Sequence, residues 1–230
     1  MSEITVRPDF PVVVLISGQG SNLQALIDQQ DALDINIVAV ISNRPSVLGL
    51  ERASQAGIPA ITLDHREYSD RNQFDQAMAK EIDKLHPALI VLAGYMRILS
   101  DDFVRHFRGR LINIHPSLLP AYRGLHTHRR VLDAKESYHG TSVHYVSEEL
   151  DGGPVITQAR LKVENHDSEQ TLLDRVQAME HQLYPLSVGL IRRGEIGFKD
   201  QKIEYRGKKL DTPLVFDEGA ITLKTGSGNP

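Results

Sequence analysis

The stretch Arg110-Leu-Ile-Asn-Ile-His-Pro-Ser-Leu-Leu-Pro-Ala-Tyr-Arg-Gly124 organises this chain of 230 residues. Residues 111–114 alternate between apolar and polar side chains, which predicts a short strand. Pro116 and Pro120 have no N–H group for a sheet ladder, so the chain must leave the strand as a rigid loop. Such a loop begins at the carboxyl end of its strand. Open α/β sheets bind their ligands at that edge.

Asn113 and His115 lie two residues apart, so on a strand their side chains point to the same face. An amide donor and an imidazole placed together could stabilise an oxyanion and transfer a proton. The local sequence alone leaves another interpretation open, in which the two side chains only satisfy the backbone of the turn.

Strand and helix patterns alternate before this stretch. Short apolar runs at residues 12–16, 35–42, 59–63 and 88–94 predict strands, and helical patterns over 46–55, 72–85 and 100–107 follow three of them. This rhythm predicts an α/β fold, a single-domain, doubly wound and mostly parallel sheet. The rhythm changes after the loop. Residues 140–146 predict a half-exposed strand and 155–163 its antiparallel partner, followed by a long helix from Ser168 to Arg192. Ser46 and Ser168 are predicted to cap their helices.

The domain prediction is one catalytic unit over residues 1–193 and a polar tail over 194–230. The tail contains charged clusters and ends in Gly-Ser-Gly-Asn-Pro. We expect a short hairpin and a loose end there, and the sequence assigns this tail no function.

Composition excludes several classes of protein. A net charge of −4 and a pI of about 6.2 do not suit a binder of nucleic acid or anionic membranes. The absence of cysteine rules out disulfides, thiolate catalysis and Cys-ligated zinc. No signal peptide and no membrane-spanning run is evident, so the sequence predicts a soluble, cytoplasmic protein.

The chain has ten histidines, which raises the question of a metal site. His126 and His128 lack the helical i, i+4 spacing of zinc motifs, and no His-Glu-x-x-His accompanies them. The sequence therefore predicts no metal. Roles in polar networks are expected for His126, His128, His139 and His144.

The loop Ser17-Gly-Gln-Gly-Ser-Asn22 joins the first predicted strand to a helical pattern beginning at Leu23. A glycine turn of this kind directs free backbone N–H groups at a phosphate. Leu23 stands where a dinucleotide site needs its third glycine, and Gly-Lys-Ser/Thr is absent from the chain. The loop therefore predicts a site for one phosphate. Helix capping by Ser21 and Asn22 is the alternative that the pattern leaves open.

Taken together, Asn113-Ile-His-Pro-Ser-Leu-Leu-Pro and the following Gly124-Leu-His-Thr-His128 resemble the signature of the folate-dependent formyltransferases. The resemblance extends from about Val12 to about Ser187. The Gly-Leu-His-Thr-His ending is most similar to the branch that formylates glycinamide ribonucleotide in purine biosynthesis. The resemblance implies a Rossmann-like fold, small-molecule partners, and 10-formyltetrahydrofolate as a co-substrate that leaves as tetrahydrofolate, without a metal.

The resemblance also implies roles for individual residues. As catalytic residues it implies Asn113, His115 and the carboxylate of Leu-Asp-Gly-Gly-Pro, Asp151, which local sequence alone would assign to a turn. For the ribonucleotide it implies Gly20, Ser21, Asn22 and Gln177 at the phosphate and Glu180 at the amine. For the folate it implies Met96, Arg97, Ile98 and Leu99 at the pterin, Arg71 at the glutamate tail, and Asn113. Gln19 departs from the asparagine that is frequent in the family.

Three alternatives stay open at this stage. A formyltetrahydrofolate hydrolase would add an N-terminal regulatory domain, for which we expect no room before Val12. A methionyl-tRNA formyltransferase would add a C-terminal nucleic-acid-binding domain, which this acidic chain is not expected to carry. The third alternative is a ligand-binding α/β protein that keeps the phosphate loop without catalysis.

Overall fold

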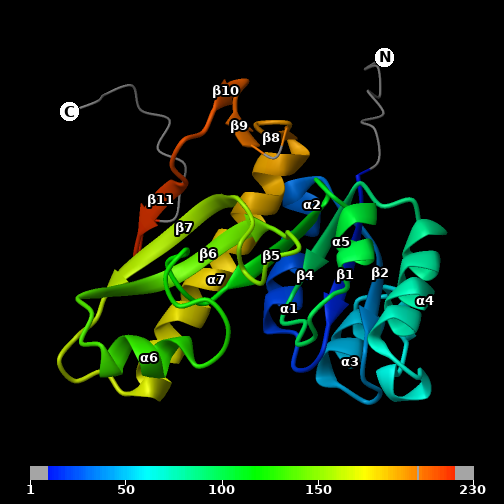
Figure 1. The fold of residues 1–230 in the computed structure, drawn as a ribbon, viewed down its shortest axis with the longest axis horizontal. Coiled ribbons are helices and arrows are strands. Elements are labelled where there is room, and N and C mark those ends of the chain that lie inside the picture. The colour runs from blue at the N-terminus through cyan, green and yellow to red at the C-terminus, as the bar shows by residue number, and fades with distance from the viewer. Residues whose placement is uncertain (1–9, 201, 221–230) are drawn as a thin grey trace.

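A central mixed sheet forms the core of the protein (Figure 1). The computed structural model describes residues 10–200 and 202–220, and within them this sheet has eight strands in the order β11-β7-β6-β5-β4-β1-β2-β3. The parallel part consists of β1 (Pro11–Ile16), β2 (Asn36–Ser42), β3 (Ala60–Thr62), β4 (Leu89–Leu92) and β5 (Leu111–His115). The antiparallel part adds β6 (Tyr138–Tyr145) and β7 (Val155–Lys162). The predicted fold class is confirmed.

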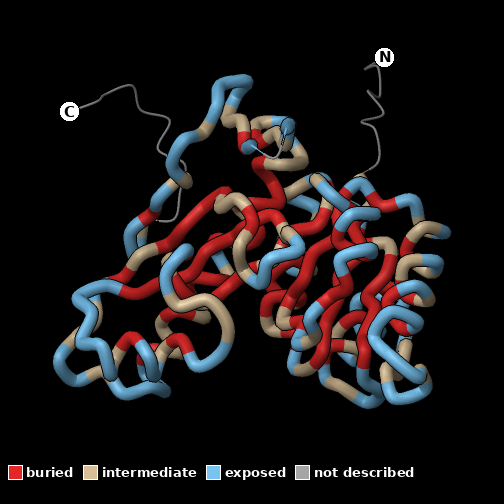
Figure 2. Tube along the Cα trace, in the orientation of Figure 1, coloured by how far each residue is buried: buried red, intermediate tan, exposed pale blue. Residues whose placement is uncertain are grey.

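Helices cover both faces of the sheet. Their bounds are α1 (Ser21–Ile27), α2 (Gln30–Leu33), α3 (Leu48–Gln55), η1 (His65–Glu67), α4 (Arg71–Asp83), α5 (Asp101–His106), α6 (Thr127–Asp133) and α7 (Glu169–Arg192). Side chains alternate along β1, so Val12 and Val14 join an apolar cluster with α1 and α7, while Val13 and Leu15 join another with α4 and α5. The strands are accordingly buried along most of their length (Figure 2). A strand covered on both faces explains the continuous apolar run at residues 12–16.

The long helix α7 packs on the sheet and is hydrogen-bonded to β4 and β5, the two strands that end beside the proline loop. Ser168 caps it as predicted, accepting a hydrogen bond from the N–H of Thr171, and the Thr171 side chain completes a capping box. The buried Tyr184 hydroxyl lies 2.9 Å from the carbonyl oxygen of Leu92 on β4 and 3.2 Å from that of Ile112 on β5. α7 is therefore held against the two strands whose carboxyl ends open on the functional edge.

Two local predictions are wrong. Strand β6 is buried from His139 to Tyr145 rather than half-exposed, because α7 packs on it and the proline loop also contacts it. Within that second contact, the N–H of Leu119 donates to Ser142 Oγ at 3.0 Å. Ser46 does not cap α3, because it has a φ of 54° and Val47 takes the N-cap position without a side-chain hydrogen bond.

The polar tail contains more structure than the sequence suggested. The predicted hairpin is formed by β8 (Ile196–Lys199) and β9 (Lys202–Tyr205), and β10 (Lys208–Lys209) extends it. Beyond it, β11 (Leu214–Asp217) joins the main sheet parallel to β7 and buries Phe216. The loose end predicted at the C-terminus falls partly on residues 221–230, outside the described residues.

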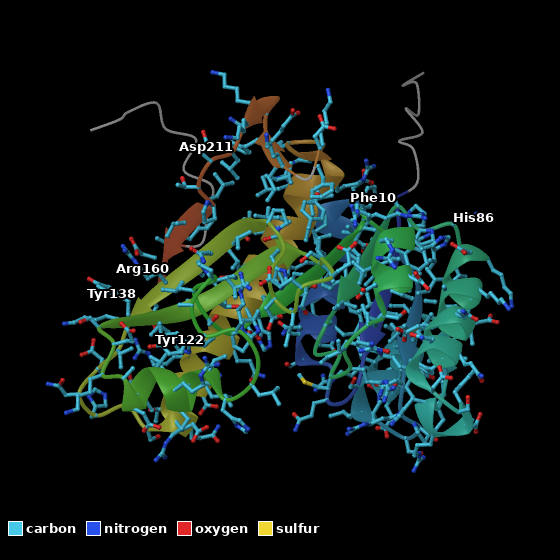
Figure 3. All side chains as sticks on the ribbon, in the orientation of Figure 1. Phe10, His86, Tyr122, Tyr138, Arg160 and Asp211 are labelled. Carbon is cyan, nitrogen blue, oxygen red and sulfur yellow. The ribbon has the colours of Figure 1, made fainter. Side chains whose placement is uncertain are left out.

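Ion pairs and ring contacts support this outer part of the sheet. The Arg160 guanidinium lies 4.9 Å from the ring centroid of Tyr138, near the end of the β6–β7 ribbon (Figure 3), and 2.8 Å from an Asp217 carboxylate oxygen. The β11 segment is thus attached to β7 by side chains as well as by backbone pairing.

Within the described parts of the chain, every helix is too short or too polar to cross a membrane.

Candidate active site

Three loops meet at the carboxyl edge of the parallel strands, and the Ser17 hydroxyl joins them. Ser17 Oγ, directly after β1, donates to Asn43 Oδ1, directly after β2, at 2.5 Å. The same oxygen accepts a hydrogen bond from the backbone N–H of Met96, in the loop after β4, at 2.8 Å. All three positions are fixed relative to one another, so cavities on the two sides of this junction have a common rigid wall.

The first cavity, which we call the glycine-loop cavity, measures about 700 Å³ and is lined by residues 17–22 together with Gln177 and Glu180 of α7. Gly20 has a φ of +70°, and a Cβ atom there would lie 2.8 Å from the Gly49 Cα atom. Only glycine therefore suits this turn. Gly20 is also the N-cap of α1 and no side chain caps that helix, so capping by Ser21 or Asn22 is wrong. The N–H groups of the first helical turn have no intrahelical acceptor.

A buried carboxylate forms the inner wall of this cavity. Glu180 Oε2 accepts a hydrogen bond from Asn22 Nδ2 at 3.0 Å, and Oε1 lies 3.3 Å from Thr141 Oγ1. Burial raises the pKa of Glu180 to about 7. The side-chain amide oxygen of Asn22, Oδ1, is buried and has no hydrogen-bond partner among the described residues. This corner therefore offers acceptors and lacks a donor, which an amine could supply.

Gln177 completes the entrance on the α7 side. Its Nε2 donates to Ser21 Oγ at 3.2 Å, so the amide reaches the turn that begins α1. Gln177 and Glu180 lie three residues apart on one helix and face the same loop. Both residues predicted for the ribonucleotide therefore line one cavity with Gly20, Ser21 and Asn22.

The second cavity, which we call the Arg97 cavity, is smaller, about 140 Å³. Its apolar wall is formed mainly by Leu92, Tyr95, Ile98, Leu99 and Val104. Within the described residues, no group accepts a hydrogen bond from the backbone N–H groups of residues 97–99. Apolar walls beside free backbone groups suit a flat heteroaromatic ring with hydrogen-bonding edges.

Asn113 stands on the polar side of the Arg97 cavity and is oriented by a neutral histidine. Its Nδ2 lies 3.2 Å from His144 Nε2, and His144 Nδ1 lies 2.9 Å from the carbonyl oxygen of Tyr145. Burial lowers the pKa of His144 to about 4, so the ring is neutral near pH 7. A neutral ring that donates from Nδ1 must accept at Nε2. One N–H of Asn113 is therefore held by His144 and the other stays available to a ligand.

His115 is buried between two hydrogen-bond acceptors. Its Nε2 lies 2.9 Å from the carbonyl oxygen of Tyr122, and its Nδ1 lies 3.4 Å from Asp151 Oδ2. A neutral imidazole donates from one nitrogen only, whereas the imidazolium donates from both. Both ring nitrogens of His115 therefore have an acceptor within reach.

The turn that carries Asp151 is shaped to bring the carboxylate inward. Asp151 has a φ of 48°, and the adjacent Gly153 packs so tightly that a Cβ atom would lie 1.8 Å from the Tyr145 carbonyl oxygen. Asp151 Oδ2 also accepts the backbone N–H of Gly124 at 2.9 Å, and Oδ1 lies 3.8 Å from His144 Nε2. The carboxylate thus contacts both histidines, one belonging to β5 and the other to β6.

Polar residues occupy the space between the two cavities. Thr141 Oγ1 lies 3.3 Å from Glu180 Oε1 and donates to the backbone oxygen of His115 at 3.0 Å. The His115 ring faces Asp151, and Asn113 lies beside His144 at the other cavity. Positioned donors, a carboxylate and titratable rings provide the groups that acyl transfer to an amine requires.

The structure separates some residues that the sequence grouped. Met96 lines the glycine-loop cavity, not the Arg97 cavity that holds Arg97, Ile98 and Leu99. His115 lines neither cavity, because the Tyr122 carbonyl covers its outer nitrogen. Arg71 is exposed at the first turn of α4 and lies outside the lining of the Arg97 cavity.

Sequence reasoning assigned no site role to Ser17, Thr141 and His144. The signal for His144 was available in the pairing of two adjacent strands. His144 and Asn113 are cross-strand partners in the β5–β6 ladder, so their side chains lie on one face. The other two residues occupy ordinary-looking positions, and only the meeting of distant loops reveals what they contact.

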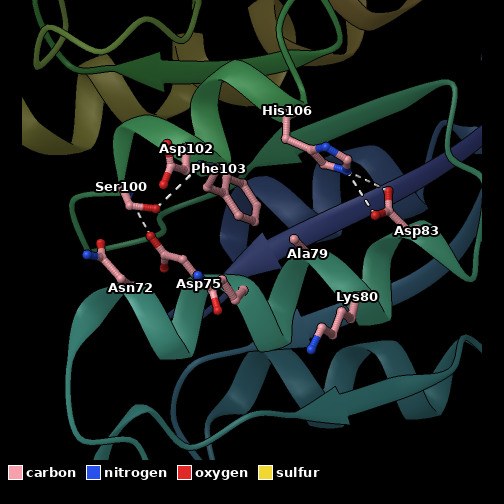
Figure 4. A pocket seen from close by; sticks show the side chains of 10 residues that line it. Asn72, Asp75, Ala79, Lys80, Asp83, Ser100, Asp102, Phe103 and His106 are labelled. Atoms are coloured by element: carbon pink, nitrogen blue, oxygen red, sulfur yellow. Dashed lines mark hydrogen bonds and ion pairs between the residues drawn. The ribbon is translucent and has the colours of Figure 1, made fainter.

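A further hollow between α4 and α5 measures about 280 Å³ (Figure 4). Several of its polar groups are already paired, since Asp75 Oδ2 accepts the Ser100 N–H at 2.5 Å and His106 Nε2 lies 2.9 Å from Asp83. Elsewhere His128 Nδ1 lies 3.0 Å from His139 Nε2, the polar-network role expected for them. Across the described residues, no three His, Cys, Asp or Glu side chains are grouped as metal ligands would be.

Comparisons with known proteins agree with this geometry. The sequence profile of the formyl transferase family matches residues 11–188. The phosphoribosylglycinamide formyltransferase of Escherichia coli is 49% identical over 201 residues, covering 86% of this chain and 95% of that protein. A human trifunctional purine biosynthetic protein, adenosine-3, is 41% identical over 187 residues, which are 80% of this chain and 18% of that longer protein.

Solved structures show the same likeness. The phosphoribosylglycinamide formyltransferase of Coxiella burnetii superposes with a TM-score of 0.87 at 48% identity, covering 90% of this chain and 99% of that one. The glycinamide ribonucleotide transformylase 1 of Symbiobacterium toebii superposes with a TM-score of 0.82 at 37% identity, covering 86% and 94%.

Proposed function

The chain belongs to the formyl transferase family, and we propose how its two cavities carry out the reaction of its relatives. It transfers a formyl group from 10-formyltetrahydrofolate to the amine of 5′-phosphoribosylglycinamide, giving formylglycinamide ribonucleotide and tetrahydrofolate. The observation that carries the assignment of roles is the presence of two cavities on either side of the Ser17 junction, one suited to a phosphorylated amine and the other to a flat ring.

The ribonucleotide occupies the glycine-loop cavity. Its phosphate accepts hydrogen bonds from the backbone N–H groups of Gly20, Ser21 and Asn22 and from the Gln177 amide. Its amine lies against Glu180 and the unpartnered side-chain oxygen Oδ1 of Asn22, where the cavity lacks a hydrogen-bond donor. A carboxylate whose pKa is about 7 can hold the ammonium form and then accept its proton, leaving the amine nucleophilic.

The folate occupies the Arg97 cavity. Ile98 and Leu99 pack on the ring, and the free backbone groups of residues 97–99 pair with its edge. The bound folate supplies the formyl group on N10 as an activated acyl donor. Met96 belongs to the wall between the two substrates, because it lines the glycine-loop cavity. Arg71 is proposed for the glutamate tail, which extends beyond the cavity.

Asn113 stabilises the transition state. When the amine attacks the formyl carbon, the new C–N bond forms and the carbonyl oxygen becomes an oxyanion. The free N–H of Asn113 donates to this oxygen while His144 holds the amide in place. The oxyanion then collapses, the C–N bond to the folate nitrogen breaks, and that nitrogen gains the proton that the attacking amine has lost.

His115 and Asp151 complete the charge arrangement. The Asp151 carboxylate lies 3.4 Å from Nδ1 of His115 and orients the ring, and the Tyr122 carbonyl oxygen lies 2.9 Å from its Nε2. When the Nε2–H group of His115 donates to the oxyanion in place of the Tyr122 carbonyl oxygen, a protonated His115 acts as a second, charged donor. The structure thus supports a small shift of the Tyr122 segment as part of the catalytic cycle.

A coupled assay tests the proposed function directly. The wild-type protein is mixed with glycinamide ribonucleotide and 10-formyltetrahydrofolate, and release of tetrahydrofolate is followed together with formylation of the amine. Tetrahydrofolate formed equally without the ribonucleotide would identify a hydrolase. Formylation of methionyl-tRNA instead would identify the tRNA enzyme, and no turnover with any acceptor would leave a ligand-binding protein.

The proposal also extends to partners and location. Both substrates are small anions, and the acidic chain does not suit nucleic acid or anionic membranes. We place the protein in the cytoplasm, where a chain without cysteines needs no oxidative maturation.

A further inference from the structure

The residues of the glycine-loop cavity described so far provide no positive charge to balance the phosphate of the ribonucleotide. A phosphate monoester carries about −1.5 to −2 charges near pH 7. The cavity wall already contains the carboxylates Asp174 and Glu180. Backbone N–H groups and the Gln177 amide carry no net charge, so they do not compensate the dianion. Among the described residues that line this cavity, Arg44 alone is a cation.

Arg44 stands at the carboxyl end of β2, next to the glycine loop. Ile16 of β1 pairs with Ser42 of β2, so the two strands end side by side. The Arg44 backbone is fixed there, because Ser42 Oγ lies 2.6 Å from its carbonyl oxygen and accepts its N–H at 3.1 Å. In a doubly wound sheet the end of the second strand faces a ligand bound at the first glycine turn. The position therefore directs an arginine toward that ligand.

The guanidinium of Arg44 is not used by the fold. It is exposed, and no described residue forms an ion pair or a hydrogen bond with it. The nearby Arg52 differs, since its Nε donates to the Gln19 carbonyl oxygen at 3.0 Å and its NH1 to Gln24 Oε1 at 3.0 Å. Arg52 supports the loop from outside, whereas Arg44 has five N–H donors available on the cavity side.

We propose that Arg44 is the cation that anchors the phosphate of the ribonucleotide and makes the site select phosphorylated substrates. This inference rests on the proposed function. Arginine suits the task because its planar fork binds two phosphate oxygens at once. Arg44 acts in binding and does not touch the reacting atoms, so its contribution is to affinity for the ribonucleotide and not to the rate of formyl transfer.

The experiment compares Arg44→Gln and Arg44→Lys with the wild type. Loss of a charge-assisted contact predicts a rise of roughly tenfold to a hundredfold in KM for the ribonucleotide in Arg44→Gln. The kcat and the KM for the folate should stay unchanged, and Arg44→Lys should give an intermediate KM. Lys80→Gln removes an exposed cation on α4, away from this cavity, and should change nothing.

Direct binding gives a second readout that needs no turnover. The Kd of ribose 5-phosphate, measured by calorimetry without folate, should rise in Arg44→Gln by a factor similar to the rise in KM. Added salt should weaken binding more steeply in the wild type than in Arg44→Gln. An unchanged Kd and KM overturns the proposal, as does a loss of kcat at unchanged KM. A wild type that binds ribose 5-phosphate without formylating the ribonucleotide refutes the proposed function instead.

Discussion

The two cavities share a wall, and burial prepares the polar groups of each for a different task. In the glycine-loop cavity, burial keeps Glu180 close to its titration point, with a pKa of about 7. In the Arg97 cavity, burial keeps His144 firmly neutral, with a pKa lowered to about 4. In the mechanism we propose, one group exchanges a proton with the substrate amine, whereas the other remains a fixed acceptor for Asn113. The same desolvation therefore produces a proton carrier on one side and a rigid support on the other.

The largest expected effect comes from removing the donor on the rigid side. Asn113→Ala should lower kcat by about 10²–10³-fold, because a positioned oxyanion donor is lost. Both KM values should change much less, since the amide acts mainly on charge that develops in the transition state. Steady-state kinetics with each substrate varied in turn would measure this. A folded Asn113→Ala protein with nearly normal kcat would contradict the role of the Arg97 cavity in the chemical step.

The buried acid on the other side should appear in protein stability as well as in kinetics. The folded protein holds the Glu180 proton up to a pKa of about 7, while the unfolded chain releases it near the ordinary glutamate pKa of 4.5. The folded state thus binds more protons between these values, and its stability must fall as pH rises from about 4.5 to 7. At pH 8 the loss is on the order of 3 kcal/mol.

Glu180→Gln should abolish this loss, so the variant should gain stability relative to the wild type as pH rises, while its KM for the ribonucleotide increases. Denaturant unfolding at pH 4.5 and pH 8 measures the difference. Glu51→Gln, which alters an exposed carboxylate on α3, serves as the control and should follow the wild type. Parallel pH profiles for all three proteins would refute the raised pKa.

A bulky side chain in the glycine loop should raise the KM for the ribonucleotide without changing the KM for the folate. Gly18 lines the glycine-loop cavity, and an added Cβ there meets nothing within 4 Å, whereas Gly20 has a positive φ and the Gly49 backbone beside it. Gly18→Val should therefore fold and raise KM for the ribonucleotide roughly tenfold by displacing its hydrogen bonds. The KM for the folate should stay within about twofold. An equal rise in both values would mean that the two cavities are not independent.

The smallest expected effect is on the KM for the folate, and it comes from shortening a side chain in the Arg97 cavity. Ile98 is 58% exposed on the wall of the Arg97 cavity, so Ile98→Ala costs the fold little. Removing its ring contact should raise KM for the folate by roughly threefold to tenfold. The ribonucleotide KM should remain unchanged in the same assay. A larger effect on the ribonucleotide than on the folate would reverse the assignment of the two cavities.

The sequence predicted the features that depend on neighbouring residues, but not those that depend on contacts between distant segments. The strands, the common face of Asn113 and His115, and the capping of α7 by Ser168 follow from local patterns, and the structure confirms them. The burial of β6 and the Tyr122 contact of His115 depend on how a proline loop folds back onto the sheet. Ser17, a single serine before a glycine, gave no signal of its contacts with the two other loops.

The same limit applies to electrostatics. Sequence similarity implied that Glu180 meets an amine, but its pKa is raised by burial in the folded protein, against the lowering effect of Asn22 on α1 and Thr141 on β6. The position of Arg71 at the start of α4 was correct, yet its link to the folate remains a prediction, because the residue lies outside the cavity lining.

Strand β11 has a consequence for how the protein is made. β7 pairs with β6, which precedes it in the chain by only the loop of residues 146–154, so this ribbon can form early. The outer edge of β7 is covered only when residues 214–217 arrive, about fifty residues later. An uncovered edge strand is a template for pairing with other molecules. During synthesis or refolding the protein therefore passes through a period in which β7 can recruit a second chain. Variants shortened before Leu214 would extend that period indefinitely, and aggregation during expression would reveal it before any loss of activity could be measured.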